Sequence, residues 1–442
     1  MQSNQSISPE DLTAFRRHHR EDPLSRTAAG AVSRTPIDQV CWNQQQASHM
    51  THTFSLEIPT LEACDQKASG RCWIFAALNL LREKVAKDLD LENFQLSQNY
   101  IAFYDHLEKA NTFLENILST AGDPLDDRYV SRLLALPVGD GGWWEYFVGL
   151  CVKYGTVPQE AMPDTYQSCH TESMNTILNM QLRKDALVLR TAKNQGEDET
   201  RLRQRKQLML DRVYHFLALC LGEPPETFDF EYVGRDKVYH AHRDLTPESF
   251  YARFIGRNVE NIVSILNAPI PSVPFYRTCY TLGEESIYGS YQAKRLNLPI
   301  EDFKAAVIRQ LRAGEPVWFV CDCDYYGSQK EGIWDTVLYD YESLFGLDLQ
   351  MEKGDLLDLR QCSLNHAMVF TGVNLVDGRP DKWKIQNSWG TEKAREGYFV
   401  CSDSWFDRYV YTASIDRKYL TPEENRLFDQ EPMILAPWNV LG

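Results

Sequence analysis

The sequence contains no apolar run long enough to cross a bilayer, and its first 22 residues have no apolar core of the kind found in secretory signals. Its eleven cysteines are odd in number and follow no repeating spacing, which does not suit a disulfide framework. These absences predict a cytoplasmic protein with reduced thiols and without a membrane partner.

Positive charge is also in short supply, since 46 Lys and Arg stand against 62 Asp and Glu and give a net charge of −16. Nucleic acids require a basic surface, so the composition argues against them as partners of the whole chain. One segment differs, because residues 181–212 hold nine Lys and Arg against five Asp and Glu. A contact with an acidic surface, most simply another subunit, and a solvated helix face explain this segment equally well.

Signatures of cofactor binding are missing as well. Neither a phosphate-binding Gly-Lys-Ser/Thr motif nor a G-x-G-x-x-G loop follows a predicted strand. His240 and His242 have a spacing that suits a metal on a strand, and so do Cys321 and Cys323, but further ligands are not evident beside either pair. We therefore predict structural roles for both pairs, and neither a metal nor a cofactor.

Residues 66–75 contain a candidate nucleophile, Cys72. It opens the segment 72–89, which lacks Gly and Pro and predicts a buried helix with the thiol in its first turn, where the helix dipole favours an anion. Gln66 precedes it by six residues and could donate to an oxyanion beside the Cys72 backbone N–H. A buried structural cysteine on a core helix is the alternative, and this stretch alone does not decide between them.

The matching base lies far along the chain, after the sequence turns β-rich. Asp377-Gly378 is a hairpin signal between alternating apolar residues, with His366 eleven residues before Asp377 and Asn387 nine after Gly378. The two side chains are therefore predicted to be near neighbours on adjacent strands. A histidine in this position can take the thiol proton, and an asparagine can hold the imidazole in the useful tautomer. Trp389 would cover the bond between them.

Gly141 and Gly142 allow two interpretations. Adjacent glycines before a bulky apolar run commonly form a tight turn. Their backbone could instead bind an extended peptide substrate as an added strand, without side chains in the way.

Several blocks together resemble the bleomycin hydrolase/aminopeptidase C family of papain-like cysteine peptidases. The blocks include QKASGRCWIF (66–75), LPVGDGG (136–142), NHAMVFTGV (365–373), IQNSWG (385–390) and EPMILAPW (431–438). Cys72 and His366 lie 294 residues apart, whereas papain-like enzymes separate them by about 130–150. The excess indicates an insertion, in which 173–192 and 201–222 predict a helical hairpin.

The expected fold is α+β: a papain-like two-part catalytic fold, with a helical half and a β-barrel-like half, plus a large, mainly helical insertion. We predict an N-terminal arm packed on the body (1–50), a helical half with the nucleophile (51–163), the insertion (164–300), a β half with His366 and Asn387 (301–420) and a C-terminal tail (421–442).

The resemblance implies Cys72 as nucleophile, His366 as general base and acid, Asn387 as its orienting partner and Gln66 in the oxyanion hole. It also implies a homohexamer with the insertion as interlocking arm, and a tail whose terminal carboxylate, on Gly442, receives the free amine of the substrate. Such a protein would remove N-terminal residues from short peptides and could also act on bleomycin-like amides. An endopeptidase or acyl transferase on the same site, and an oligomeric nucleic-acid-binding protein, are the alternatives.

Overall fold

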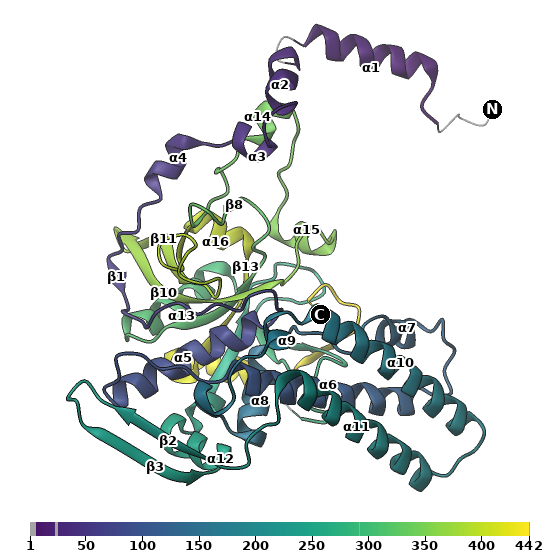
Figure 1. Ribbon diagram of the computed structural model, residues 1–442. Coiled ribbons are helices and arrows are strands. Elements are labelled where there is room, and N and C mark those ends of the chain that lie inside the picture. Colours follow the sequence, from purple (N-terminus) through teal and green to yellow (C-terminus); the bar gives the residue numbers. More distant parts are fainter. Residues whose placement is uncertain (1–5, 23–24, 291, 442) are drawn as a thin grey trace.

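The computed structural model describes residues 6–22, 25–290 and 292–441, which form a helical half and a β half, one below the other in Figure 1. Within these ranges, no helix is both long and apolar enough to cross a membrane. The two halves have separate hydrophobic cores, one built mainly from α5, α6, α8, α10 and α11 and the other from the large sheet and the helices around it.

The helical half is organised around α5, which begins at Cys72 and ends at Asp88 as its uninterrupted sequence predicts. Residues 73–79 are all buried, because α5 lies between α6 and the sheet strand β10. Other helices of this half are α6 (Gln98–Ser119), α7 (Arg128–Ala135), α8 (Trp144–Tyr154), α9 (Tyr166–Cys169) and α12 (Pro247–Phe250). All of these except α8 begin at capping side chains, such as that of Ser97, which accepts from the N–H of Tyr100.

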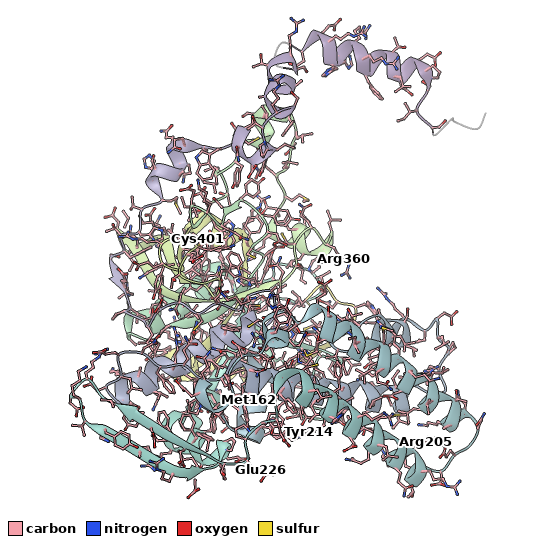
Figure 2. All side chains as sticks on the ribbon, viewed as in Figure 1. Met162, Arg205, Tyr214, Glu226, Arg360 and Cys401 are labelled. Atoms are coloured by element: carbon pink, nitrogen blue, oxygen red, sulfur yellow. The ribbon has the colours of Figure 1, made fainter. Side chains whose placement is uncertain are left out.

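Two long helices form the predicted hairpin: α10 (Glu172–Asn194) and α11 (Glu199–Leu221). Figure 2 shows Arg205 close to the free end of this hairpin. Most of its basic side chains bind carbonyls or carboxylates of this same chain, which explains the positive segment 181–212 without an acidic partner. They are Arg183, Arg190, Lys193, Arg203, Arg205, Lys206 and Arg212.

The β half contains a 12-stranded sheet in the order β14-β5-β6-β4-β13-β7-β10-β11-β12-β9-β8, with β1 added to β10. Its strands are β1 (Leu56–Glu57), β4 (Ile262–Leu266), β5 (Thr278–Thr281), β6 (Arg295–Asn297), β7 (Val317–Cys321), β8 (Gly327–Ser328), β9 (Ile333–Trp334), β10 (His366–Val376), β11 (Arg379–Gln386), β12 (Tyr398–Ser402), β13 (Val410–Asp416) and β14 (Met433–Leu435). The helices of this half are α13 (Ile300–Arg312), α14 (Tyr341–Phe345), α15 (Lys353–Asp358), α16 (Asp403–Tyr409) and α17 (Pro422–Phe428).

Strands β4, β5 and β6 differ from the sequence prediction, which assigned residues 164–300 to a mainly helical insertion. These strands belong to the same sheet as β13 and β7, so a boundary at 300 divides one sheet. They have only five, four and three residues, too few for a strand periodicity to be visible. A separate ribbon in this segment, β2 (Phe228–Val233) with β3 (Tyr239–Leu245), carries His240 and His242.

The N-terminal segment also differs in part. It forms α1 (Pro9–Glu21), α2 (Ser25–Val32), α3 (Ile37–Val40) and α4 (Gln44–His49). Figure 1 shows α1 projecting away from the body, and none of its residues is buried, so the expected packing on the body is wrong for this helix. The chain reaches the body at Cys41–Asn43, where the Asn43 N–H donates to Leu338 O.

Candidate active site

Cys72 is the first residue of α5, and its side chain is partly buried against the helical core. Burial raises the pKa of its thiol, while hydrogen bonds from the backbone N–H groups of Ala367 and Trp73 act in the opposite direction. The sulfur therefore lies against the start of β10, one residue after His366. The helix N-terminus adds a favourable field for the thiolate.

His366 and Asn387 are brought together by the β10–β11 hairpin, which turns at Asp377 (φ +51°) and Gly378 (φ +79°). His366 begins β10, and Asn387 directly follows β11. His366 Nε2 lies 2.9 Å from Asn387 Oδ1. This is the neighbourhood that counting outward from the turn predicts.

The tautomer of His366 follows from its partner. Asn387 Oδ1 also accepts from the backbone N–H of Ser388 at 2.7 Å, which identifies this atom as the amide oxygen. An oxygen cannot donate, so Nε2 of His366 must carry the hydrogen of the 2.9 Å bond. In the neutral ring, Nδ1 is then the free acceptor. Burial lowers the pKa of His366 to about 4, against the effect of the Asn387 bond, so the ring is neutral at pH 7.

Trp389 covers this pair. Its ring stacks on the imidazole of His366 with 4.9 Å between centroids and 24° between planes. His366 and Asn387 are 6% and 0% exposed, so water has little access to the bond between them. A hydrogen bond that excludes water is stronger than an exposed one.

Gln66 lies in the loop before α5 and is 7% exposed. Its backbone N–H donates to Ser388 O at 2.9 Å, which ties the loop to the β half next to Asn387. Its side-chain Nε2 donates to Ser69 O at 2.7 Å. An amide nitrogen carries two hydrogens, so this bond leaves one for another acceptor.

The loop containing Gly141 and Gly142 faces α5 from the helical half. The Gly141 carbonyl accepts from Lys109 Nζ at 2.6 Å, and a Cβ added at Gly142 would lie 2.5 Å from the indole of Trp73. Gly142 is thus required by close packing against Trp73, the residue after Cys72, whereas a Cβ added at Gly141 meets nothing within 4 Å. Both glycines line a cavity of ≈ 350 Å³.

The C-terminal tail reaches the same region. Pro437 lines the cavity of Gly141 and Gly142, while Val440 and Leu441 line a second cavity of ≈ 190 Å³. Trp143 and Leu364, which is two residues before His366, line both cavities. Gly442 itself lies outside the described residues.

Three arginines hold the tail. Arg295 Nη1 donates to Leu441 O at 3.1 Å, and Leu441 is 1% exposed. Arg360 Nη2 donates to Trp438 O at 2.9 Å, and the Arg128 guanidinium lies 4.3 Å from the centre of the Trp438 ring. Sequence reasoning missed these arginines, because they lie in unrelated segments without a shared motif.

The model of the Peptidase C1-like family matches residues 6–442. The chain belongs to this family. Similar proteins include Aminopeptidase C of Lactobacillus delbrueckii subsp. lactis, 39% identical over 442 residues and covering 99% of this chain and 98% of the relative. Aminopeptidase C of Listeria monocytogenes is 39% identical over 433 residues, with 98% of each chain covered. A crystal structure of pepw from Lactobacillus rhamnosis is 41% identical, covers 99% of each chain and has a TM-score of 0.98.

Membership in the Peptidase C1-like family confirms the expected papain-like fold class, with its mixture of helix and sheet. It also confirms the expected enzyme class, a cysteine-type aminopeptidase, since the relatives of closely similar length carry that name.

Proposed function

We propose that the chain removes N-terminal residues from short peptides through an acyl-enzyme on Cys72, with His366 as base and acid and Asn387 as orienting residue. The observation that carries this proposal is the shared oxygen of Asn387. It receives the Ser388 N–H and the His366 Nε2–H together, which leaves Nδ1 of His366 as the acceptor for a thiol proton.

In the first half-reaction, His366 Nδ1 takes the proton of Cys72 Sγ, and the thiolate attacks the carbonyl carbon of the first peptide bond. The resulting oxyanion is stabilised by the Cys72 N–H, which has no helical acceptor in the first turn, and by the second hydrogen of Gln66 Nε2. The C–N bond then breaks as His366 gives its proton to the leaving amine. A thioester of the N-terminal residue remains on Cys72.

In the second half-reaction, His366 takes a proton from water, and the hydroxide oxygen attacks the thioester carbonyl. The C–S bond breaks, the free amino acid leaves, and the proton returns to the sulfur. Hydrolysis of bleomycin-like amides, which the sequence resemblance also implies, would use this chemistry and depend on Cys72 in the same way.

The preference for a free N-terminus is supported by the position of the tail. Leu441, the last described residue, is buried next to Trp143 and Leu364, so the tail reaches the loops that flank Cys72 and His366. A carboxylate at that place would attract a cationic amine and obstruct a longer chain. Two of the proteins to which this chain is similar are named Aminopeptidase C.

The proposal is tested with matched peptides that differ only in N-terminal acetylation, given to the parent protein and to Cys72→Ser. We expect rapid release of the first residue from the free peptide, negligible cleavage of the acetylated one, and an inactive variant. Cleavage inside the acetylated peptide would support the endopeptidase alternative. Activity surviving in Cys72→Ser would refute the mechanism.

We further propose a homohexamer in a reducing, cytoplasmic setting. All eleven cysteines are free thiols. The α10–α11 hairpin exposes large apolar side chains, a pattern that supports a subunit interface there; they are Ile177, Met180, Leu187, Leu208 and Leu219. Sedimentation equilibrium should give six times the 51.1 kDa chain mass, and a monomer mass would contradict the assembly.

A further inference from the structure

Asp140 lies between Gly139 and Gly141. Its side chain is only 11% exposed and contacts residues 66–71, the loop before α5, which we call the nucleophile loop. Oδ2 accepts from the backbone N–H of Gly70 at 2.8 Å. The backbone carbonyl of Asp140 accepts from Trp73 Nε1 at 2.7 Å. One residue therefore holds the chain two residues before Cys72 and one residue after it.

The same carboxylate is bound from the helical side. Oδ2 also accepts from Thr171 Oγ1 at 2.5 Å, and Oδ1 accepts from Asn175 Nδ2 at 2.6 Å. His106 Nε2 lies 3.3 Å from Oδ1. Every side-chain contact of Asp140 thus comes from a donor, a pattern that only a carboxylate satisfies completely.

His106 supplies the opposite charge. It is 1% exposed, its Nδ1 lies 2.8 Å from Ala102 O, and its Nε2 lies 2.9 Å from Asn175 Oδ1. Both ring nitrogens face acceptors, so both carry hydrogens and the ring is an imidazolium. Burial alone would lower the pKa of His106, but the hydrogen bond and charge of Asp140 outweigh it and raise that pKa.

The charge of His106 matters to Cys72. The negative charge of Asp140 is one of the influences that raise the pKa of the Cys72 thiol. An unpaired carboxylate so close to the nucleophile would oppose the thiolate. With His106 protonated beside it, the net charge of the pair is close to zero, so the hydrogen bonds to the nucleophile loop are kept while the opposition to the thiolate is reduced.

The backbone at Gly70 is packed closely against Asp140. A Cβ added at Gly70 would lie 2.7 Å from Asp140 Cβ, so the two loops touch with no space for a side chain at position 70. All eleven cysteines are free, hence this contact is not reinforced by a disulfide.

We infer that Asp140, with His106 as its charge partner, is a positioning residue that locks the nucleophile loop to the Gly141-Gly142 substrate loop. The lock fixes the backbone N–H of Cys72, one of the two proposed oxyanion donors, relative to the loop that would bind the peptide. This inference rests on the proposed function of Cys72. Small displacements at such a site reduce the rate strongly, by about 100-fold for about 1 Å.

The test uses the pair Asp140 and Asn175. In Asp140→Asn, either orientation of the new amide places its NH₂ against another hydrogen-bond donor, so one contact is lost. In Asn175→Asp, two carboxylates face each other and repel. The double swap Asp140→Asn/Asn175→Asp restores a donor and acceptor at this contact and keeps a carboxylate for His106. Turnover is expressed per Cys72 titrated with an irreversible thiol reagent, so that unfolded molecules do not count.

We expect each single variant to lose about tenfold to 100-fold in kcat per titrated site, and the swap to recover most of that loss. Asp185→Asn is the matched control, because Asp185 is also a largely buried, ion-paired carboxylate and lies ten residues after Asn175 on the same helix. It should retain the parent kcat. If Asp140→Asn does not fold, Thr171→Val removes one donor at constant shape and should still lower kcat per site.

The inference would be overturned if Asp140→Asn and Asn175→Asp kept the kcat of the parent per titrated site, even if their melting temperatures fell. If those two variants do not fold, the same result in Thr171→Val would overturn it. A swap as inactive as the single variants would overturn it too. Cys72→Ser separates this failure from failure of the proposed function. Activity in Cys72→Ser refutes the proposed mechanism, whereas an inactive Cys72→Ser with unaffected Asp140 variants refutes only the lock.

Discussion

Alanine substitution should lower stability at Gly142 but not at Gly141, although the two residues are neighbours. At Gly142 the new Cβ would lie 2.5 to 2.8 Å from three atoms of the Trp73 indole. Trp73 is 1% exposed, and its Nε1 is held by Asp140 O at 2.7 Å, so the ring cannot move without losing that bond. Overpacking of this kind costs about 1–3 kcal/mol. At Gly141 the Cβ meets nothing within 4 Å, and we expect a change within about 0.5 kcal/mol.

Gly141→Ala should instead lower the catalytic efficiency, kcat/KM. Gly141 is exposed and lines the ≈ 350 Å³ cavity, so a methyl group there would occupy space that an extended peptide needs. A misplaced methyl in a binding site changes kcat/KM by about tenfold or more. Gly141→Ala should therefore keep the stability of the parent and lose about tenfold in kcat/KM.

Urea unfolding and peptide kinetics on both variants and the parent provide the assay. Gly142→Ala with the stability of the parent would refute the packing argument. If Gly141→Ala has an unchanged kcat/KM, the exposed backbone of this loop does not bind the substrate.

Three other predictions follow from the hydrogen bonds and pKa shifts. Asn387→Ala should lower kcat by about 100-fold or more, because the ring of His366 loses the acceptor that fixes its tautomer; a loss below threefold in steady-state kinetics would contradict this. Since burial lowers the pKa of His366 to about 4, and a protonated ring cannot accept the thiol proton, kcat/KM should fall as pH drops through about 4; a limb near the ordinary value of about 6.5 would contradict it. Because the pKa of His106 is raised in the folded protein, its protonation contributes to the free energy of unfolding. This contribution is fully present below about pH 6.5 and is lost as pH rises through the pKa of the folded state. In urea unfolding, His106→Gln should therefore lack the fall in stability with rising pH that the parent shows.

The sequence predicts those parts of the site that depend on local signals. The helix from Cys72 follows from a segment without Gly or Pro. The approach of His366 to Asn387 follows from one turn, because Asp377-Gly378 sets the register of both flanking strands.

Contacts between distant segments had no comparable signal. Asp140 binds Gly70, His106 and the start of α10 at Thr171 and Asn175, which are three separate parts of the chain. A buried polar network of this type depends on tertiary packing, which has no periodicity or spacing to reveal it. The short strands β4, β5 and β6 escaped prediction for a related reason, since their place in the sheet depends on pairing with one another and with β13 and β14.

The central claim, a thioester on Cys72, is tested most directly by trapping it. The protein is mixed with an activated ester of an amino acid that has a free amine, quenched in acid within milliseconds to seconds, digested and mapped by mass spectrometry. We predict one acyl group per chain, on the peptide that contains Cys72, and its loss in Cys72→Ser. Two results would contradict the account. One is acylation of any of the other ten cysteines in place of Cys72. The other is turnover without a trapped acyl group under conditions where deacylation limits the rate.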